Sequence, residues 1–460
     1  GQDADPGGMQ CYQYDTLGRV EHSYINPQSD DVADCTVTGT IIGARQTDFS
    51  YDGDGNLYTQ TELNTNDRVT THTNYVYGKP TETVITTGTR SNVHYCRDYE
   101  PRGMVAWETD GRGCSTSYQT VYGYDFSGRR TSADPPLSDP INYWYPLRDS
   151  TQALVTRGDR VMDYRFDRIG SGNLTAIYKH VGASLKTTQL FAVTNDALGR
   201  RRLIQQLWDT RLGDVFSYDP LGRLTTITHP DATQVTIDYA GSAVTVTDEN
   251  NHITDYVYRA FGNPNDRRLA SLTDAGKFTT TYGYDTVFGN LDSIDAPLAH
   301  GDRSFRYHSD STACDNGFLS RETHPESGTT SYKYNCLGDI TTRTREGKEI
   351  TTYDYDSAGR LTNINYSDSS SDVDLTYDQA SRRTSVMNDN ASTVFTYDNA
   401  GRLSTVTQSI VGGPQCQEIS YLYDSLDRLH TMTYPSSRVV RYGWNDDNWL
   451  TSVTGADGYD

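Results

Sequence analysis

The sequence lacks the features that define several large classes of protein. No apolar run approaches the roughly 20 residues of a membrane-spanning helix, so we expect no membrane span. Basic residues are few: 40 Lys and Arg stand against 61 Asp and Glu, and this net charge of −21 does not suit a nucleic-acid ligand. G-x-S-x-G, P-loop and HExxH motifs are missing, so we expect no enzyme, no catalytic residue and no cofactor.

Cysteine is also scarce, and its spacing matches no metal-binding pattern. The chain has seven cysteines and no CxxC or CxxH motif, so we expect no metal site. Six of them form neighbours 24, 18 and 22 residues apart: Cys11 and Cys35, Cys96 and Cys114, and Cys314 and Cys336. These spacings permit disulfides between adjacent strands in an oxidising compartment, and they equally permit reduced, buried thiols. Cys416 is left over in either case.

The sequence is rich in one aromatic residue, tyrosine. There are 35 Tyr against 11 Phe and 5 Trp. Tyrosine favours half-buried pleated surfaces because its ring packs and its hydroxyl stays polar. This composition predicts a thin β-structure with much exposed surface.

A seven-residue phrase, aromatic-Asp-x-x-Gly-Arg-Leu, recurs along the chain. Its clearest copies contain Tyr14, Asp15, Gly18 and Arg19; Tyr124, Asp125 and Gly128; Tyr218, Asp219, Gly222 and Arg223; Tyr355, Asp356, Gly359 and Arg360; and Tyr397, Asp398, Gly401 and Arg402. Asp followed three residues later by Gly is typical of a type I turn, and Gly supplies the positive φ that closes a hairpin with a bulge. We call each copy a YD turn, and we expect its Arg to lie over the ring of the preceding Tyr.

A recurring proline helps to define the length of the repeat. Proline follows the glycine by eight residues in several copies, as from Gly222 to Pro230, and opens a second turn. The unit is therefore two short strands and two turns, with a period of roughly 21 residues. Aromatic residues at positions i and i+2, such as Phe216 and Tyr218, precede each YD turn and share one strand face. Stacked repeats should form ladders of these rings.

Three local features remain to be explained. The array is least regular at about 131–163, where Tyr143, Trp144 and Tyr145 offer rings that could stack on a glycan, although rings of the ladder are the simpler interpretation. The string Asp52-Gly53-Asp54-Gly55-Asn56 invites a calcium interpretation, but it coincides with a YD turn. His229 and His324 directly precede prolines, so we interpret them as strand-end residues.

These repeats resemble the RHS/YD-repeat family, which includes shell components of bacterial insecticidal toxin complexes, RHS effectors, wall-associated proteins and teneurins. The resemblance covers the chain from Tyr12 to Asp460 and implies an all-β spiral of hairpins that can close into a hollow shell or solenoid. Toxin shells of this family end in a core segment rich in Asp-Pro-x-Gly, which releases a cargo by self-cleavage. Here Asp219-Pro220-Leu221-Gly222 fits as an ordinary YD turn, and no such core follows.

We therefore predict a single continuous YD-repeat array over residues 1–460, a segment of a longer chain. Its leading function is a non-catalytic scaffold, the shell of a secreted or surface toxin-like protein of bacterial origin. Its partners are then the missing N- and C-terminal segments or a cargo. The alternative is an extracellular structural or adhesive fibre, which self-associates and binds surface glycans.

Overall fold

The computed structural model describes most of the chain in detail. The described residues are 9–26, 45–63, 67–87, 90–146, 152–158, 160–166, 173–181, 186–206, 213–261, 263–286, 289–297, 301–309, 315, 317–347, 350–356, 358–413, 416–445 and 448–455. They form 38 strands of one sheet and a single 3-10 turn, Thr116–Tyr118. The predicted all-β fold class is confirmed. Among these residues, no helix has the length and apolar character to cross a membrane.

The first half of the sheet contains nineteen strands. They are β1 (Met9–Tyr14), β2 (Val20–Asn26), β3 (Arg45–Tyr51), β4 (Leu57–Glu62), β5 (Arg68–Val76), β6 (Lys79–Thr87), β7 (Arg90–Tyr99), β8 (Val105–Thr109), β9 (Gln119–Tyr124), β10 (Arg130–Asp134), β11 (Ile141–Trp144), β12 (Gln152–Arg157), β13 (Arg160–Phe166), β14 (Leu174–Val181), β15 (Lys186–Asn195), β16 (Arg201–Gln206), β17 (Asp214–Tyr218), β18 (Leu224–Thr228) and β19 (Gln234–Ala240).

The second half contains the other nineteen. They are β20 (Ala243–Thr247), β21 (Ile253–Phe261), β22 (Asn263–Thr273), β23 (Thr279–Tyr284), β24 (Leu291–Asp295), β25 (Arg303–Tyr307), β26 (Leu319–His324), β27 (Gly328–Tyr334), β28 (Ile340–Arg345), β29 (Ile350–Tyr355), β30 (Leu361–Tyr366), β31 (Val373–Tyr377), β32 (Arg383–Met387), β33 (Ala391–Tyr397), β34 (Leu403–Ile410), β35 (Gln417–Tyr423), β36 (Leu429–Thr433), β37 (Val439–Trp444) and β38 (Leu450–Gly455).

The topology is a continuous meander, because every strand pairs antiparallel with the next strand in sequence. The hairpin of β17 and β18 is typical: Ser217 pairs with Thr226, and Tyr218 pairs with Leu224. The register shift between these pairs is a β-bulge next to the YD turn. The same shift recurs before the Tyr of most YD turns, as predicted from Asp and Gly.

The sheet has little buried core. Most strand residues are half-buried, and fully buried large side chains such as Tyr24 and Val93 are few. A single twisted sheet can bury its side chains only against their neighbours along the same face. Stability must therefore come from contacts between successive repeats.

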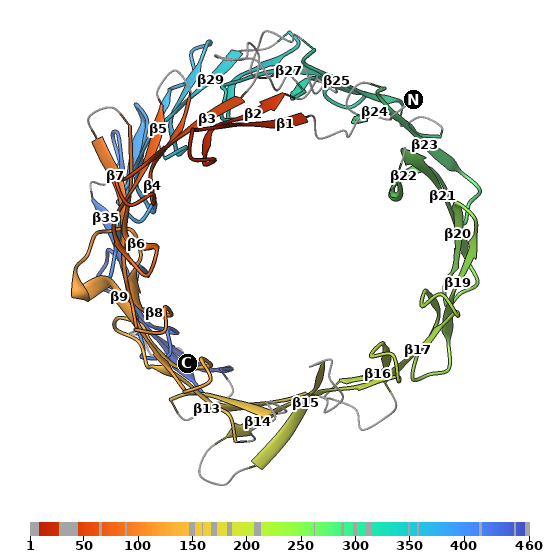
Figure 1. The fold of residues 1–460 in the computed structure, drawn as a ribbon, viewed down its shortest axis with the longest axis horizontal. Helices are drawn as coiled ribbons and strands as arrows, with labels where there is room; N and C mark the ends of the chain where they lie inside the picture. Colours follow the sequence, from red (N-terminus) through yellow and green to blue (C-terminus); the bar gives the residue numbers. More distant parts are fainter. Residues whose placement is uncertain are drawn as a thin grey trace.

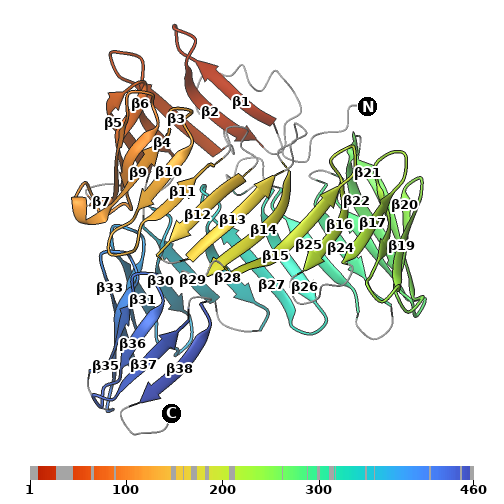
Figure 2. The same cartoon turned by 90° about the horizontal axis from the view of Figure 1, so that it is seen from below.

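The sheet is wound into a ring (Figure 1). The chain starts at the top of this view, passes once around through β5, β13, β19 and β25, and then continues past its own beginning. Seen from the side, the later strands β28–β38 lie on a second level of a spiral (Figure 2). No described strand crosses the centre of the ring. The overall shape is a spiral wall that surrounds a central space.

Candidate functional site

The YD turn is fixed by one carboxylate. In the copy at residues 218–223, Oδ1 of Asp219 accepts hydrogen bonds from the backbone N–H groups of Leu221 and Arg223, both at 2.9 Å. Its Oδ2 accepts from Nε of Arg223 at 2.7 Å. The backbone closes the turn with Gly222 N–H to Asp219 O at 3.0 Å, and Gly222 has a φ of +83°. The same side-chain bonds recur at Asp15, Asp125, Asp196, Asp356, Asp398 and Asp424.

These bonds lower the pKa of several of the turn carboxylates. The backbone N–H of Arg19 is the main cause that lowers the pKa of Asp15. For Asp125 and Asp219, partial desolvation opposes the shift, but hydrogen bonds from the backbone and side chain of the motif arginine still lower the pKa. Both carboxylate oxygens of Asp15, Asp125 and Asp219 are thus engaged within the turn itself.

In most repeats the tyrosine that ends the strand before the turn reaches back to the previous repeat. The hydroxyl of Tyr239 donates a hydrogen bond to the carbonyl oxygen of Leu224 at 2.9 Å. That carbonyl belongs to the residue directly after the motif arginine of the previous YD turn. The same bond is made by Tyr51, Tyr124, Tyr218, Tyr284, Tyr307, Tyr355, Tyr377, Tyr397 and Tyr423. Trp444 makes it through its indole N–H to Leu429 O at 2.8 Å.

The motif arginine reaches forward. We expected it over the tyrosine that precedes it in its own turn, and this expectation is wrong. Arg223 lies over the ring of Tyr239, in the next turn, 4.3 Å from the ring centroid. Arg19 over Tyr51, Arg129 over Tyr145, Arg200 over Tyr218, Arg360 over Tyr377, Arg382 over Tyr397 and Arg402 over Tyr423 follow the same rule. Asp219 binds Nε and Nη2 of Arg223 while the guanidinium lies over the ring of Tyr239.

Degenerate copies keep the geometry with other residues. Ser381 and Asp427 occupy the glycine position with φ values of +62° and +65°. The turn that contains Ser381 was missed in the sequence because neither its glycine nor its leucine is present. The Asp52 string forms the same turn: Asp52 Oδ1 accepts from the backbone of Asp54 and Asn56, and its Oδ2 accepts from the Asn56 side chain. The calcium interpretation therefore has no support in this geometry.

Successive levels of the spiral touch along what we call the seam. The seam comprises Arg112, Ser138, Asp139 and Arg157 on the first level and Asn399, Ser425 and Asp427 on the second. The backbone N–H of Asp139 donates to Ser425 O at 2.7 Å, and Ser425 Oγ donates to Asp139 Oδ2 at 2.9 Å. Arg112 Nη2 donates to Asn399 O at 2.9 Å across a separation of 287 residues.

Asp427 is the most connected residue of the seam. Its carboxylate accepts a hydrogen bond from Ser138, pairs with Arg157 of the other level, and pairs with Arg402 Nη1 at 2.7 Å. Desolvation opposes ionisation here, but the bonds from Ser138, Arg157 and Arg402 lower the pKa of Asp427. Ser138 and Arg157 both lie in the irregular stretch 131–163. This stretch supplies most of the first-level residues of the seam, and Arg112 lies outside it.

The other predicted residues lie at several places in the wall. Trp144 is exposed, whereas Tyr145 is covered by Arg129, so Tyr145 is a ladder residue. His229 lies between two carboxylates, with Nδ1 2.8 Å from Asp214 and Nε2 2.9 Å from Glu249. The hydrogen bond that the His229 ring donates to the Asp214 carboxylate is the main cause that raises the pKa of His229. His324 contacts Glu322.

The cysteines form disulfides. Cys96 is joined to Cys114, with Cα atoms 5.2 Å apart. Cys11 and Cys336 each take part in a further disulfide. Cys35 and Cys314 lie outside the described residues. Cys416 is free and exposed. The Cys96–Cys114 bond ties β7 to the loop that follows β8, and this loop carries the seam residue Arg112.

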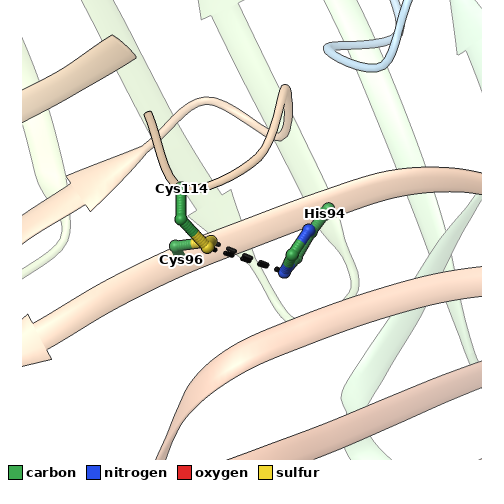
Figure 3. A group of neighbouring side chains, drawn as sticks. All are labelled: His94, Cys96 and Cys114. Carbon is green, nitrogen blue, oxygen red and sulfur yellow. Dashed lines mark hydrogen bonds between the residues drawn. A yellow bond between two sulfur atoms is a disulfide. The ribbon is translucent and has the colours of Figure 1, made fainter. Parts of the chain in front are cut away.

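One histidine stands beside this disulfide. Nε2 of His94 is 3.5 Å from Cys96 Sγ and 3.7 Å from Cys114 Sγ (Figure 3). Among the described residues, this trio is the group of His, Cys, Asp and Glu side chains close enough to share a metal ion. The sequence did not indicate it, although His94-x-Cys96 places both side chains on one strand face.

Comparisons with known proteins agree with this architecture. The family model Teneurin YD-shell matches residues 243–373, and RHS Repeat matches residues 423–460. No curated protein matches the sequence.

Solved structures share the fold at low identity. The TcdB2-TccC3-Cdc42 structure has a TM-score of 0.57 at 12% identity, covering 93% of this chain and 25% of that one. TcdB2-TccC3 without its hypervariable C-terminal region gives 0.55 at 14% identity, covering 94% and 24%. The Tc holotoxin pore of Photorhabdus luminescens gives 0.50 at 13% identity, covering 97% and 24%.

The chain thus spans about a quarter of the length of these structures. At such identities the likeness concerns the fold alone. The two family models match residues 243–373 and 423–460, and with the YD turns that recur outside these ranges they show that the repeats of this chain resemble those of the RHS/YD-repeat family.

Proposed function

We propose that residues 1–460 form one continuous wall segment of a protein shell that encloses or presents a cargo. The observation that carries this proposal is the winding of a single sheet past its own start, locked by the seam. A wall of this kind surrounds a space without needing a second protein to close its side. Its repeats contact mainly their neighbours, which is the design of a scaffold.

The matched structures support a cargo that lies on another segment. One of them is described as TcdB2-TccC3 without its hypervariable C-terminal region. By analogy, we place the cargo of this shell outside the 460 residues, in a flanking segment or a partner chain.

We propose a non-catalytic role and a secreted or surface location in bacteria. The turn carboxylates have both oxygens engaged by the turn, as at Asp219, and are poorly placed for acid-base chemistry. Disulfides such as Cys96–Cys114 form and persist in oxidising compartments.

A fibre remains the second candidate because the ends of the sheet are open to pairing. Among the described strands, β1 pairs only with β2 and β38 only with β37. Such edges can add a strand from another copy. In a fibre, the exposed Trp144, with Tyr143 and Tyr145 beside it, would be the first place to seek glycan contact.

Electron microscopy of the purified chain distinguishes the two. The shell proposal expects discrete ring-like particles with one chain in the wall, at every protein concentration tested. Filaments that lengthen with concentration would contradict it and favour the fibre. The matched variant is Asp427→Asn, which keeps the turn but removes the carboxylate charge that pairs with Arg157 and Arg402. It should loosen the contact between the two levels without creating filaments.

A further inference from the structure

The Cys96–Cys114 disulfide has an unusual neighbour in His94. Nε2 of this ring lies within 3.7 Å of both sulfur atoms. A structural disulfide does not require a histidine, and neither the YD turn nor the seam uses this ring.

We propose that, once this disulfide is reduced, His94, Cys96 and Cys114 bind a soft divalent metal ion of the zinc class. Thiolate sulfur and imidazole nitrogen are the ligands that zinc prefers. In a tetrahedral site with Zn–S near 2.3 Å and Zn–N near 2.1 Å, a sulfur and a nitrogen ligand lie about 3.5 Å apart. The distances of 3.5 Å and 3.7 Å from Nε2 to the two sulfurs match the nitrogen-to-sulfur spacing of this arrangement. The sulfurs are bonded to each other in the oxidised chain and must separate to about 3.8 Å after reduction.

The surroundings favour a cation. The carboxylate of Glu82 lies 3.8 Å from His94 Nε2, and Glu82 stands directly opposite Cys96 in the register of β6 and β7. Arg112, the nearest loop cation, is neutralised by Asp110, whose carboxylate is 2.6 Å from its Nη2. Water completes the coordination as the fourth ligand, as in open zinc sites.

The backbone around the trio is held independently of the disulfide. Thr109 Oγ1 accepts from the N–H of Cys96 at 2.9 Å. His94 and the loop exchange two backbone bonds, His94 N–H to Gly111 O and Gly113 N–H to His94 O, both at 2.9 Å. The ligands therefore stay near one another when the covalent bond is broken, so the site is preorganised.

Metal binding at this site follows reduction of the disulfide in two steps. A water-soluble phosphine transfers two electrons to the disulfide, takes oxygen from water to become the phosphine oxide, and leaves two thiols. The metal ion then displaces the two thiol protons, and both sulfurs coordinate as thiolates. The metal would replace the disulfide as the link that holds the loop of Arg112 at the seam under reducing conditions.

The test is a titration of the full chain with Co²⁺ alone and then Zn²⁺, in a background in which every cysteine except Cys96 and Cys114 is replaced by serine, so that reduction frees thiols at this site only. After phosphine treatment and removal of the reagent, we expect one ion per chain, a thiolate-to-cobalt absorption band, and about two protons released per ion near neutral pH. The oxidised chain should bind no ion at this site. Equal binding by oxidised and reduced chains would overturn the proposal.

Matched variants assign the ligands. His94→Ala keeps Cys96 and Cys114, and we expect its affinity for Co²⁺ to fall at least about tenfold. The control His229→Ala removes a histidine from another carboxylate cluster and should change nothing. Circular dichroism checks the fold of each variant. Affinity unchanged in His94→Ala, or a charge-transfer band that survives in Cys96→Ser/Cys114→Ser, would overturn the assignment.

Discussion

The tyrosine hydroxyl before the turn is a specific contact between repeats in most copies of the motif. In the aromatic pairs that precede the turns, the first ring is Phe in several repeats, for example Phe216, Phe305 and Phe395. The second ring always carries a donor, tyrosine or the indole of Trp444. In most repeats it is the second position that donates to the carbonyl of the previous repeat; in the pair Tyr75 and Tyr77 the first ring, Tyr75, donates to Leu57 O instead. The need for this donor explains much of the excess of tyrosine over phenylalanine.

Strand β35 allows the two aromatic positions to be compared directly. Tyr423→Phe removes the donor to Leu403 O, which is 3.0 Å away, and leaves that carbonyl without this partner. We expect a local loss of about 0.5–1.5 kcal/mol. Tyr421→Phe, at the first position, should be nearly neutral. Hydrogen exchange of the amides of β34 and β35 measures both. Equal effects of the two substitutions would contradict the role assigned to the hydroxyl.

The turn aspartates predict how stability depends on acid. For Asp15, Asp125, Asp196 and Asp219 the folded-state pKa lies below the ordinary value of 3.8. Their contribution is therefore fully present above about pH 4 and is lost as the pH falls through the lowered folded value. We expect the thermal midpoint to be steady near neutrality and to drop steeply below pH 4. Circular dichroism melts across this range check the prediction. A midpoint that stays constant or rises would contradict it.

At the scale of the element, the residue at the glycine position of the YD turn can have two structural roles. Glycine serves the backbone, which needs a positive φ. Asp427 occupies this position in place of the preferred glycine, and its side chain pairs with Arg157 in the seam. A departure from the repeat pattern thus marks a place where the turn contacts another part of the molecule.

Replacing the residue at this position separates the two roles. Asp427→Gly restores the preferred backbone residue but removes the contacts to Ser138, Arg157 and Arg402. Partly exposed ion pairs contribute about 0.2–1 kcal/mol each, so we expect faster hydrogen exchange in loop 135–140 while the turn itself stays intact. Ser381→Gly is the matched control, because it relieves the same φ without touching Asp427's partners. Faster exchange in the control as well would refute the assignment.

The sequence predicts elements well because their signals are local. Asp219 and Gly222 define a turn and its bulge within four residues, and the spacing of Cys96 and Cys114 suggested a disulfide between neighbouring elements. The partner of Arg223 was misjudged because the aspartate, only four residues away, turns its guanidinium toward the next ring. His94 was missed because the loop that brings Cys114 beside it bends back without a motif.

At the scale of the whole molecule, the seam could not be predicted at all. Arg112 meets Asn399 across 287 residues, and Ser425 meets Asp139 across 286. Such partners depend on the twist and curvature summed over many hairpins. A one-residue change in a single loop shifts every later repeat, so no local pattern can identify the contact.

Because the sheet winds past its own start, the wall has two levels on one side of the ring and one level on the other. Strands β8–β13 and β31–β36 lie where two levels meet, whereas β19–β22, on the right of Figure 1, form a single level. We expect stronger hydrogen-exchange protection where the levels meet, because opening there breaks seam contacts as well as strand pairs. Exchange measured by mass spectrometry checks this. In Asp427→Gly the difference should shrink, and protection greater in β19–β22 would contradict the account.

The backward reach of each tyrosine also sets an order of assembly. A ribosome delivers the chain from its N-terminus, so every newly emerged tyrosine finds the carbonyl of a hairpin that has already formed. Each hairpin completes its predecessor, and the wall can lengthen by short-range steps that fold quickly. The seam must wait until some 290 more residues have been made. Synthesis and winding can therefore proceed in the same direction, with closure as the final event.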